Sequence, residues 1–353
     1  MEADETGTTL WYSTLANDGW QPRRSVVSGK DMFVNWADLP SVVPLNDKHW
    51  AAHWLEMAGE LTYSYHVVTS QSFDGGVTWS EPIKPHTDDT PTEHGFVSLF
   101  PQNGNVAAIW LDGRKTGNEQ SGDPTTSGMT LRGATIDPGG KLHDEQLIDE
   151  LICDCCQTDV AVAKFGPVAV YRDRTVDEVR DIIVSRNVDN VWTTGVPLNH
   201  DNWQIAGCPV NGPAIAAQGT RVAAAWFSAA EQEPTVQVRF SNDGGASFDT
   251  AIQLATHGAL GHVDAVLLPD GSAVVSWLQS GKGGLGNLLA RHVTPDGSMG
   301  TPLAIVSNVP ARSVPQMVPF GEELVFVWTE SSNKSSRIRS ARLPTESLPL
   351  AKP

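Results

Sequence analysis

The chain has no long apolar run and comparatively few basic residues. No stretch approaches the ~18 consecutive apolar residues of a membrane span, so we predict a soluble protein without a membrane partner. Lys and Arg number 24 against 41 Asp and Glu, which gives a formal net charge of −17. A surface this acidic repels phosphate backbones, and nucleic acid is therefore a poor partner.

The beginning of the chain also lacks a secretion signal. Residues 1–5 (Met-Glu-Ala-Asp-Glu) have neither the basic nor the apolar region of a signal peptide. The sequence therefore fits either a cytosolic protein or a mature exported protein whose leader has been replaced by Met.

What the chain does contain is one strand pattern that recurs six times. Each copy is a short apolar run ending in an aromatic residue: Trp54, Trp110, Tyr171, Trp226, Trp277 and Trp328. Consecutive copies are 56, 61, 55, 51 and 51 positions apart. A second short apolar segment precedes each run, and apolar character in both predicts strands that are buried on both faces. Four strands per ~50-residue unit is typical of a propeller blade.

We therefore predict an all-β fold: a six-bladed β-propeller with four-stranded antiparallel blades, in a single domain spanning residues 1–353. The repeats are expected to start near residues 38, 94, 156, 211, 262 and 313. Because the last repeat ends after its third strand, we expect residues 8–28 to complete it and close the ring. Closure would remove two open sheet edges. The alternative is a β-sandwich, which six matched repeats disfavour.

Two segments, 72–79 and 241–248, match the Asp-box pattern Ser-x-Asp-x-Gly-x-Thr-Trp, the second with slight changes. We interpret both as hairpin turns in which Asp accepts backbone N–H bonds, Gly takes a positive φ and the aromatic residue packs beneath. The structural residues expected are Ser72, Asp74, Gly76, Trp79, Ser241, Asp243, Gly245 and Phe248.

With these turns and the segments 153–158, 171–174 and 207–213, the chain resembles the sialidase (neuraminidase) superfamily over essentially its whole length. More narrowly, it looks like a bacterial sialidase-like group. The resemblance implies a six-bladed propeller, a periplasmic or secreted location, and a glycan or small-molecule site on the axial face away from the Asp-boxes. The chain departs from sialidases in having no Arg-Ile-Pro motif and no identifiable Tyr–Glu nucleophile pair.

Aligning the repeats places four residues at one level of the ring. Subtracting 15 from Tyr171, Trp226 and Trp277 gives Cys156, Asn211 and His262, and we match these to His94 in the second repeat. This level is expected at the mouth of the central channel. Soft thiolates and imidazoles suit copper(I) or zinc, so the predicted metal ligands are Cys155, Cys156, His94 and His262.

The cysteines leave further alternatives open. Cys153 and Cys208 fall in register on adjacent repeats, and we predict a disulfide between them. It would close a ~55-residue loop and stabilise the fold by roughly 4 kcal/mol. Alternatively, all four cysteines are structural or form two disulfides, or the thiols perform redox or nucleophilic chemistry. The other histidines, His66 and His86 among them, show no register match, and we interpret them as structural.

Charged residues after the second strands provide the remaining candidates. Guanidinium groups match carboxylates, so Arg114, Arg172, Arg174 and Arg312 are candidate substrate-binding residues. Asn211, at the level of the predicted channel mouth, is a further candidate. The candidate catalytic residues are Asp38, Asp112, Tyr171 and Asp264. The alternative for Arg114, Arg172 and Arg174 is ion pairing between blades, and the alternative for Tyr171 is a place in the core.

Three functions fit these patterns. The first is a sialidase-type glycoside hydrolase or a binder of acidic glycans. The second is a copper- or zinc-binding propeller, and the third is a non-catalytic interaction scaffold.

Overall fold

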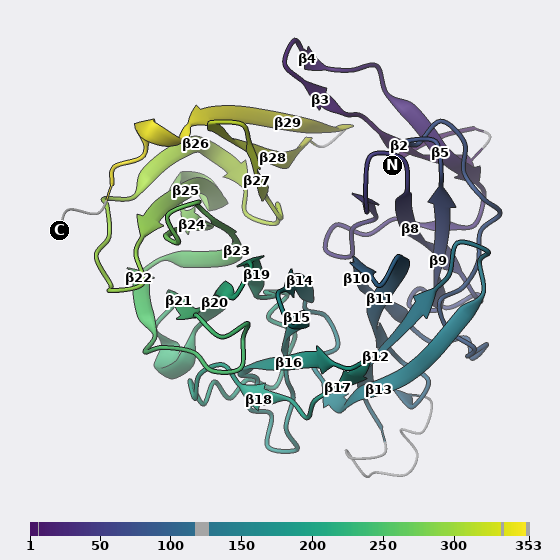
Figure 1. Ribbon diagram of the computed structural model, residues 1–353, viewed down its shortest axis with the longest axis horizontal. Helices are drawn as coiled ribbons and strands as arrows, with labels where there is room; N and C mark the ends of the chain where they lie inside the picture. Colours follow the sequence, from purple (N-terminus) through teal and green to yellow (C-terminus); the bar gives the residue numbers. More distant parts are fainter. Residues whose placement is uncertain (6, 117–126, 333–334, 351–353) are drawn as a thin grey trace. The chain divides into compact units, whose positions relative to one another are not determined.

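The computed structural model describes residues 1–5, 7–116, 127–332 and 335–350, which form antiparallel strands joined by turns (Figure 1). Among these residues no helix is long and apolar enough to cross a membrane. The chain falls into two compact units, Met1–Asp154 and Cys155–Pro353. Each unit is a series of antiparallel sheets that follow one another along the chain.

The first unit contains three sheets and a small hairpin. The N-terminal sheet has the order β1-β2-β5, and the hairpin pairs β3 with β4. In the next sheet β6 and β7 pair with one edge of β8, and β9 pairs with the other edge; the third sheet has the order β10-β11-β12-β13. The strands are β1 (Glu2–Asp4), β2 (Gly7–Tyr12), β3 (Leu15–Ala16), β4 (Gly19–Trp20), β5 (Arg24–Gly29), β6 (Met32–Phe33), β7 (Ser41–Pro44), β8 (Trp50–Met57), β9 (Tyr65–Ser72), β10 (His94–Gln102), β11 (Asn105–Asp112), β12 (Met129–Ile136) and β13 (Leu142–Ile152).

The second unit contains four sheets. Their orders are β14-β15-β16-β17 with β18 also on β16, β19-β20-β21-β22, β23-β24-β25-β26 and β27-β28-β29. The strands are β14 (Asp159–Ala163), β15 (Gly166–Arg172), β16 (Ile182–Val188), β17 (Val191–Trp192), β18 (Val196–Pro197), β19 (Ala214–Gln218), β20 (Arg221–Ser228), β21 (Thr235–Ser241), β22 (Ile252–Thr256), β23 (Ala259–Leu267), β24 (Ala273–Ser280), β25 (Leu285–Val293), β26 (Leu303–Pro310), β27 (Gln316–Phe320), β28 (Glu323–Ser332) and β29 (Ser335–Pro344), with the 3₁₀ turns η2 (Ala230–Gln232), η3 (Lys282–Gly284) and η4 (Thr345–Ser347).

The prediction of antiparallel four-stranded units is confirmed, but the predicted number of six is wrong. The described residues form seven sheets of three or more strands. The seventh arises because β2 pairs with β1 along one edge and with β5 along the other. β2 and β5 therefore belong to a three-stranded sheet of the first unit, and completion of the last sheet by residues 8–28 stays a prediction. Ring closure and the single-domain assignment stay predictions.

The core lies within and between successive sheets. The repeated aromatic residue sits in the second strand of its sheet in all six copies and is buried in each. In the second unit the first strands β14, β19 and β23 are neighbours in space. Alternate faces of β20 contribute to two different core clusters, with Trp226 on one side and Phe227 on the other. This double burial explains why these strands are almost continuously apolar.

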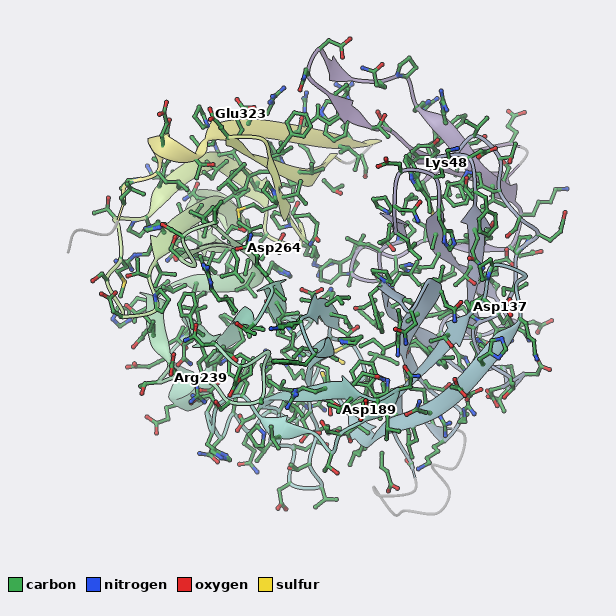
Figure 2. The ribbon with its side chains drawn as sticks, viewed as in Figure 1. Lys48, Asp137, Asp189, Arg239, Asp264 and Glu323 are labelled. Atoms are coloured by element: carbon green, nitrogen blue, oxygen red, sulfur yellow. The ribbon has the colours of Figure 1, made fainter. Side chains whose placement is uncertain are left out.

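Side-chain oxygens connect the first strands of successive sheets. The Phe96 N–H donates to Asp38 Oδ1 (2.9 Å), the Ile215 N–H to Asp159 Oδ2 (2.8 Å), the His262 N–H to Asn211 Oδ1 (2.7 Å) and the Met317 N–H to Asp264 Oδ2 (2.5 Å). Burial raises the pKa of the three carboxyl groups, to about 8 for Asp38, about 6 for Asp159 and about 7 for Asp264. Asp38, Asn211 and Asp264 were expected at a binding site, and the side chain of each accepts a backbone N–H of the next sheet. Asp264 is labelled in Figure 2.

Candidate functional site

The beginning of β9 lies beside the beginning of β10 in the first unit. Tyr65, the first residue of β9, forms a parallel bridge with Glu93, which directly precedes β10. Successive side chains of an extended chain point to opposite faces. Tyr65 and Glu93 therefore share one face of the bridge, and His66 and His94 share the other. Two chemically different groups lie back to back.

The first group is a tyrosine–carboxyl pair. The Tyr65 hydroxyl donates to Glu93 Oε1 at 2.5 Å. Tyr65 is fully buried and its ring stacks on Phe33 with centroids 4.3 Å apart, whereas Glu93 is partly exposed. Burial raises the pKa of Glu93 to about 7, the Tyr65 hydrogen bond acts to lower it, and the charge of Asp154 acts to raise it. Burial, with the charges of neighbouring acidic groups including Glu93, raises the pKa of Tyr65 far above its usual value.

Asp38 lies next to this pair. Its Oδ2 has no hydrogen-bond partner among the described residues. A Cβ atom added to Gly95 would lie 2.0 Å from Asp38 Oδ2 and 3.0 Å from Tyr65 Cε2. Only glycine fits at position 95, because any larger residue would displace one of these two side chains.

The second group is a cluster of three histidines. His66 comes from β9, His86 from the loop between β9 and β10, and His94 from the first position of β10. One ligand nitrogen from each lies within 4.8 Å of the other two. The rings of His86 and His94 stack with centroids 4.4 Å apart, and the His66 ring lies 5.2 Å from each. His86 and His94 are buried, while His66 is partly exposed.

Hydrogen bonds fix the orientation of two of these rings. His86 Nδ1 lies 2.9 Å from the Asp88 carbonyl oxygen and therefore donates to it. Among the described residues, His86 Nε2 has no hydrogen-bond partner, and neither has His66 Nδ1. His94 Nδ1 faces the carbonyl oxygens of Thr92 (3.2 Å) and Tyr65 (3.3 Å), and Nε2 lies 3.0 Å from Asp88 Oδ2. Because these oxygens only accept, both nitrogens of His94 donate.

The electrostatics of the cluster keep two of its rings neutral. Burial lowers the pKa of His86 to about 3, and His94 and His66 act in the same direction. Burial and then His94 lower the pKa of His66. Neutral imidazoles present a lone pair, which is the form that binds metal ions.

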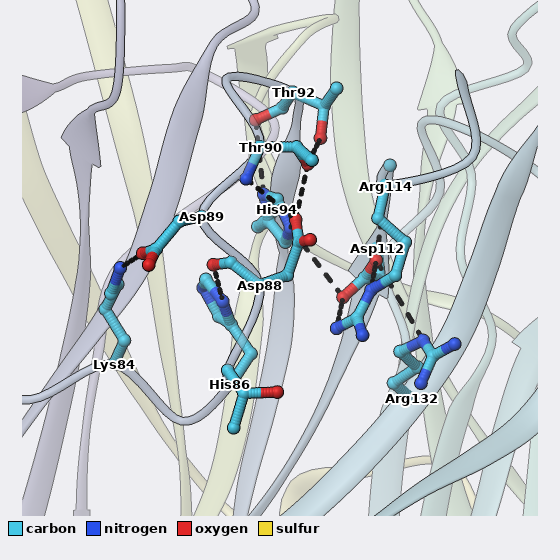
Figure 3. Close-up of polar contacts among 12 residues, drawn as sticks. Lys84, His86, Asp88, Asp89, Thr90, Thr92, His94, Asp112, Arg114 and Arg132 are labelled. Atoms are coloured by element: carbon cyan, nitrogen blue, oxygen red, sulfur yellow. Dashed lines mark hydrogen bonds and ion pairs between the residues drawn. The ribbon is translucent and has the colours of Figure 1, made fainter. Parts of the chain in front are cut away.

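A charged network borders the histidines at the end of β11 (Figure 3). Asp112 Oδ2 lies 3.7 Å from His94 Nε2. Arg114 binds both oxygens of Asp112 at 2.7 Å, and its Nη2 also donates to Glu145 Oε1 at 2.8 Å. Burial acts to raise the pKa of Asp112, but the hydrogen bonds from Arg114 and the charge of His94 bring it below its usual value. Arg114 therefore forms ion pairs within one sheet, and its guanidinium is largely occupied.

Arg172 has a structural environment in the second unit. Its guanidinium is buried and donates to the carbonyl oxygens of Asn211, Arg180 and Phe227 at 2.7–2.9 Å. It also lies over the Trp203 ring, 4.8 Å from its centroid.

Asn211, itself a candidate, thus contacts Arg172 through its carbonyl oxygen. Three further candidates of the second unit have different environments. Arg174 pairs with Glu178 at 2.7 Å, and Arg312 is exposed. Tyr171 is fully buried, as its place in the repeated aromatic position indicates.

His262 is not equivalent to His94. Both β10 and β23 have an irregular register directly after a glycine, at Gly95 and Gly261. The next residue has a positive φ in each, 52° at Phe96 and 51° at His262. His262 thus matches Phe96, two positions beyond His94. His94 belongs to the first unit and Cys155, Cys156 and His262 to the second, so the four-residue metal site stays a prediction.

The four cysteines do not form the predicted cross-link. Among the described residues there is no disulfide between Cys153, which is buried, and Cys208, which is exposed. The sulfur atoms of Cys153, Cys155 and Cys156 lie within 4.8 Å of one another.

The two segments that match the Asp-box pattern have the same hydrogen bonds. In the first, the N–H of Gly76 donates to Ser72 Oγ (2.8 Å), and the N–H and hydroxyl of Thr78 donate to Asp74 (2.9 and 2.7 Å). The second repeats this with Gly245 to Ser241 (2.9 Å) and Ser247 to Asp243 (2.9 and 2.6 Å). These bonds lower the pKa of both Asp74 and Asp243 to about 2. Both turns use these polar side chains internally, while backbone groups also bond outside them: the Gly75 N–H donates to the Lys48 carbonyl oxygen and the Gly244 N–H to that of Thr220.

Comparison with solved structures identifies the architecture. The chain is similar to an ulvan lyase of polysaccharide lyase family PL25, with a TM-score of 0.60, 8% identity, and coverage of 89% of this chain and 82% of the lyase. The fold is a β-propeller. This propeller is also similar to the NanB sialidase from Streptococcus pneumoniae (TM-score 0.55, 11% identity, 92% of this chain and 70% of the sialidase). For the α-L-arabinanase of Penicillium chrysogenum the TM-score is 0.53 at 13% identity, over 97% of this propeller and 99% of the arabinanase. No family model and no curated protein sequence matches the chain.

The site residues predicted from the sequence did not include Tyr65, Glu93, His66, His86 or Asp88. Strand alternation places Tyr65 and His66 on opposite faces, which the sequence shows. Nothing in the sequence shows that residue 65 lies beside residue 93, because that bridge joins two different sheets.

Proposed function

We propose that the protein cleaves glycan chains and that Glu93 is its proton-transferring carboxyl group. The observation that carries the proposal is the geometry of the Tyr65–Glu93 pair. Glu93 reaches solvent on one side and is held on the other by a 2.5 Å hydrogen bond from a buried hydroxyl. Glycoside cleavage uses a positioned carboxyl group to give a proton to the leaving oxygen.

The pair has the residue types of a sialidase nucleophile pair, which the resemblance implies and the sequence did not reveal. Tyr65 has no exposed surface, so it does not reach a substrate carbon. We assign it a positioning role, in which its hydroxyl fixes the Glu93 carboxyl group.

A second carboxyl group is available beside Glu93. Asp154 is partly exposed and close enough for its charge to raise the pKa of Glu93. Glycosidases usually use two carboxyl groups, one as the acid and the other as base or nucleophile. Asp38 is buried and holds the Phe96 N–H, so Asp154 is the better second member.

Aromatic side chains near the pair offer a surface for sugar rings. Trp36 is 43% exposed and lies two positions before Asp38, and Tyr63 is 61% exposed and lies two positions before Tyr65. Exposed aromatic rings provide rigid apolar faces with a polar edge. Similarity of fold to a sialidase, an arabinanase and a polysaccharide lyase supports glycans as the substrate class.

The test is turnover on a small panel of glycans. Fluorogenic sialosides and arabinofuranosides report hydrolysis, and the ultraviolet absorbance of an unsaturated product reports lyase cleavage of uronate polysaccharides. We expect Glu93→Gln to lower kcat/KM at least 100-fold on whichever substrate is cleaved, a typical loss for an acid–base residue. Tyr65→Phe should have a smaller effect, about 10-fold, and should shift the pH profile because it acts through Glu93.

Glu56→Gln is the matched control. Glu56 is partly exposed in the same unit and accepts a 2.8 Å hydrogen bond from Trp54 Nε1, so the substitution changes a hydrogen-bonded carboxylate to an amide away from the pair. It should leave kcat/KM unchanged. The proposal is overturned if the folded protein neither cleaves nor binds any substrate of the panel, or if Glu93→Gln is as active as the wild type.

A further inference from the structure

We propose that His66, His86 and His94 bind one divalent transition-metal ion, Zn²⁺, with the Asp88 carboxylate as a fourth ligand. This site lies on the opposite face of the Tyr65–Glu93 bridge, and it does not depend on the proposed glycan activity. It also differs from the predicted cysteine–histidine set, with which it shares only His94.

The distances suit a small ion. The ligand nitrogens of the three residues lie within 4.8 Å of one another, and Asp88 Oδ2 lies 3.0 Å from His94 Nε2. Ligands at ~2.0–2.1 Å from a tetrahedral zinc ion are roughly 3.4 Å apart. Small rotations of the side chains would bring the four groups to that separation.

The decisive observation is the unsatisfied nitrogen of His86. The residue is only 3% exposed, and its Nε2 has no hydrogen-bond partner among the described residues. Leaving a buried polar atom without a partner costs roughly 1–3 kcal/mol. His66 Nδ1, in the same cluster, is a second such atom. Two orphaned nitrogens within one cluster indicate a ligand that accepts their lone pairs.

The outer hydrogen bonds are those of metal-binding histidines. His86 donates its other ring hydrogen to the Asp88 carbonyl oxygen, and His94 donates Nδ1–H to the carbonyl oxygens of Thr92 and Tyr65. Metal-ligating histidines almost always donate the second N–H to a carbonyl or carboxylate, which fixes the ring. Coordination by His94 Nε2 would replace the hydrogen now directed at Asp88 and release it as a proton.

The ligand types select the class of ion. Three imidazoles and a carboxylate suit Zn²⁺ and similar borderline ions, whereas Ca²⁺ and Mg²⁺ prefer oxygen ligands and copper(I) prefers sulfur. The carboxylates of Asp88 and Asp112 supply negative charge next to the cluster. His66 is partly exposed and provides a route for the ion from solvent.

The test is zinc affinity of the chelator-treated protein, measured by competition with a chromophoric chelator, and X-ray absorption at the zinc edge. We expect one zinc ion per chain, with a first shell of nitrogen and oxygen at ~2.0–2.1 Å. His86→Gln and His66→Gln should each weaken binding at least 100-fold. The partly exposed His66 is the safer variant if His86→Gln fails to fold, and circular dichroism monitors folding in each case.

His143→Gln is the matched control. His143 is a partly exposed histidine of the same unit, 2.9 Å from a carboxylate oxygen of Asp137, and its loss should not change zinc affinity. Copper(II) affinity should fall in His66→Gln and His86→Gln as zinc affinity does, since copper binds such sites more tightly than zinc.

Two results would overturn the proposal. One is zinc affinity that is unchanged in both His66→Gln and His86→Gln. The other is a first shell dominated by sulfur at ~2.3 Å, which would place the ion at Cys153, Cys155 and Cys156. A further measurement separates the two sites: the Cys155→Ser/Cys156→Ser protein should still bind one zinc ion.

Discussion

Replacing Arg172 by methionine tests whether its guanidinium is a structural element of the second unit rather than a substrate clamp. The side chain is 2% exposed and donates to Asn211 O (2.9 Å), Arg180 O (2.7 Å) and Phe227 O (2.8 Å). Methionine is also long and unbranched but donates no hydrogen bond. Each buried acceptor left without its partner costs roughly 1–3 kcal/mol, which gives on the order of 3–9 kcal/mol for three.

The lower end of that range is the better expectation. Removing the guanidinium also recovers the free energy that was needed to desolvate a charge that has no carboxylate partner among the described residues. We therefore expect Arg172→Met to lower the free energy of unfolding by about 3 kcal/mol, and Arg172→Lys, which keeps part of the hydrogen bonding, by less.

The assay is urea unfolding followed by tryptophan fluorescence and far-ultraviolet circular dichroism. Arg174→Met is the control, since its ion pair with Glu178 is partly exposed and should contribute no more than about 1 kcal/mol. Two results would contradict this expectation. One is a free energy of unfolding for Arg172→Met within about 1 kcal/mol of the wild-type value, with the same dependence on urea concentration. The other is an equal loss of stability in Arg174→Met.

Three other substitutions test local features. Burial raises the pKa of Asp159 to about 6 from 3.8. The protonated carboxyl group therefore stabilises the folded state fully below pH ~4, and this stabilisation is lost as the pH rises through ~6. Relative to Asp159→Asn, the free energy of unfolding of the wild type should fall by about 2 kcal/mol between pH 4.5 and 7.5 in urea titrations. The pKa of Asp243 is lowered to about 2, so Asp243→Ala should lower Tm at pH 7, and the difference from the wild type should shrink as the pH falls toward 2 in thermal scans. In Gly95→Ala the new Cβ would lie 2.0 Å from Asp38 Oδ2, and thermal unfolding should show a loss of roughly 1–3 kcal/mol. Gly207→Ala should be neutral, since its Cβ would have nothing within 4 Å, and equal Tm values for the two alanine variants would contradict the steric argument.

The strand content could be predicted from the sequence because it depends on local pattern. Each apolar run ending in Trp or Tyr is a buried second strand, since a strand covered on both faces must be apolar throughout. The two Asp-box segments contain within eight residues the side-chain donors and acceptors that bind within their turns. The number of sheets could not be predicted in this way, because it depended on which strands take the two edges of β2.

The candidate site was largely hidden from the sequence. Register arithmetic on the repeats matched His94 with His262, but the irregular register after Gly95 and Gly261 shifts that alignment by two residues. Arg172 was a candidate for binding a substrate carboxylate because it has a guanidinium group. The structure shows that this group is buried and donates to three backbone carbonyl oxygens instead.

The sequence alone determined that this protein is built from repeated antiparallel sheets, because periodic apolar runs and the side-chain hydrogen bonds within the turns are properties of neighbouring residues. Only the tertiary structure brings together the residues of the two proposed sites. Glu93 meets Tyr65, and His94 meets His66 and His86, through a bridge between two sheets and a loop that folds back between them. Such contacts depend on the packing of whole sheets, and no local pattern of residues encodes them.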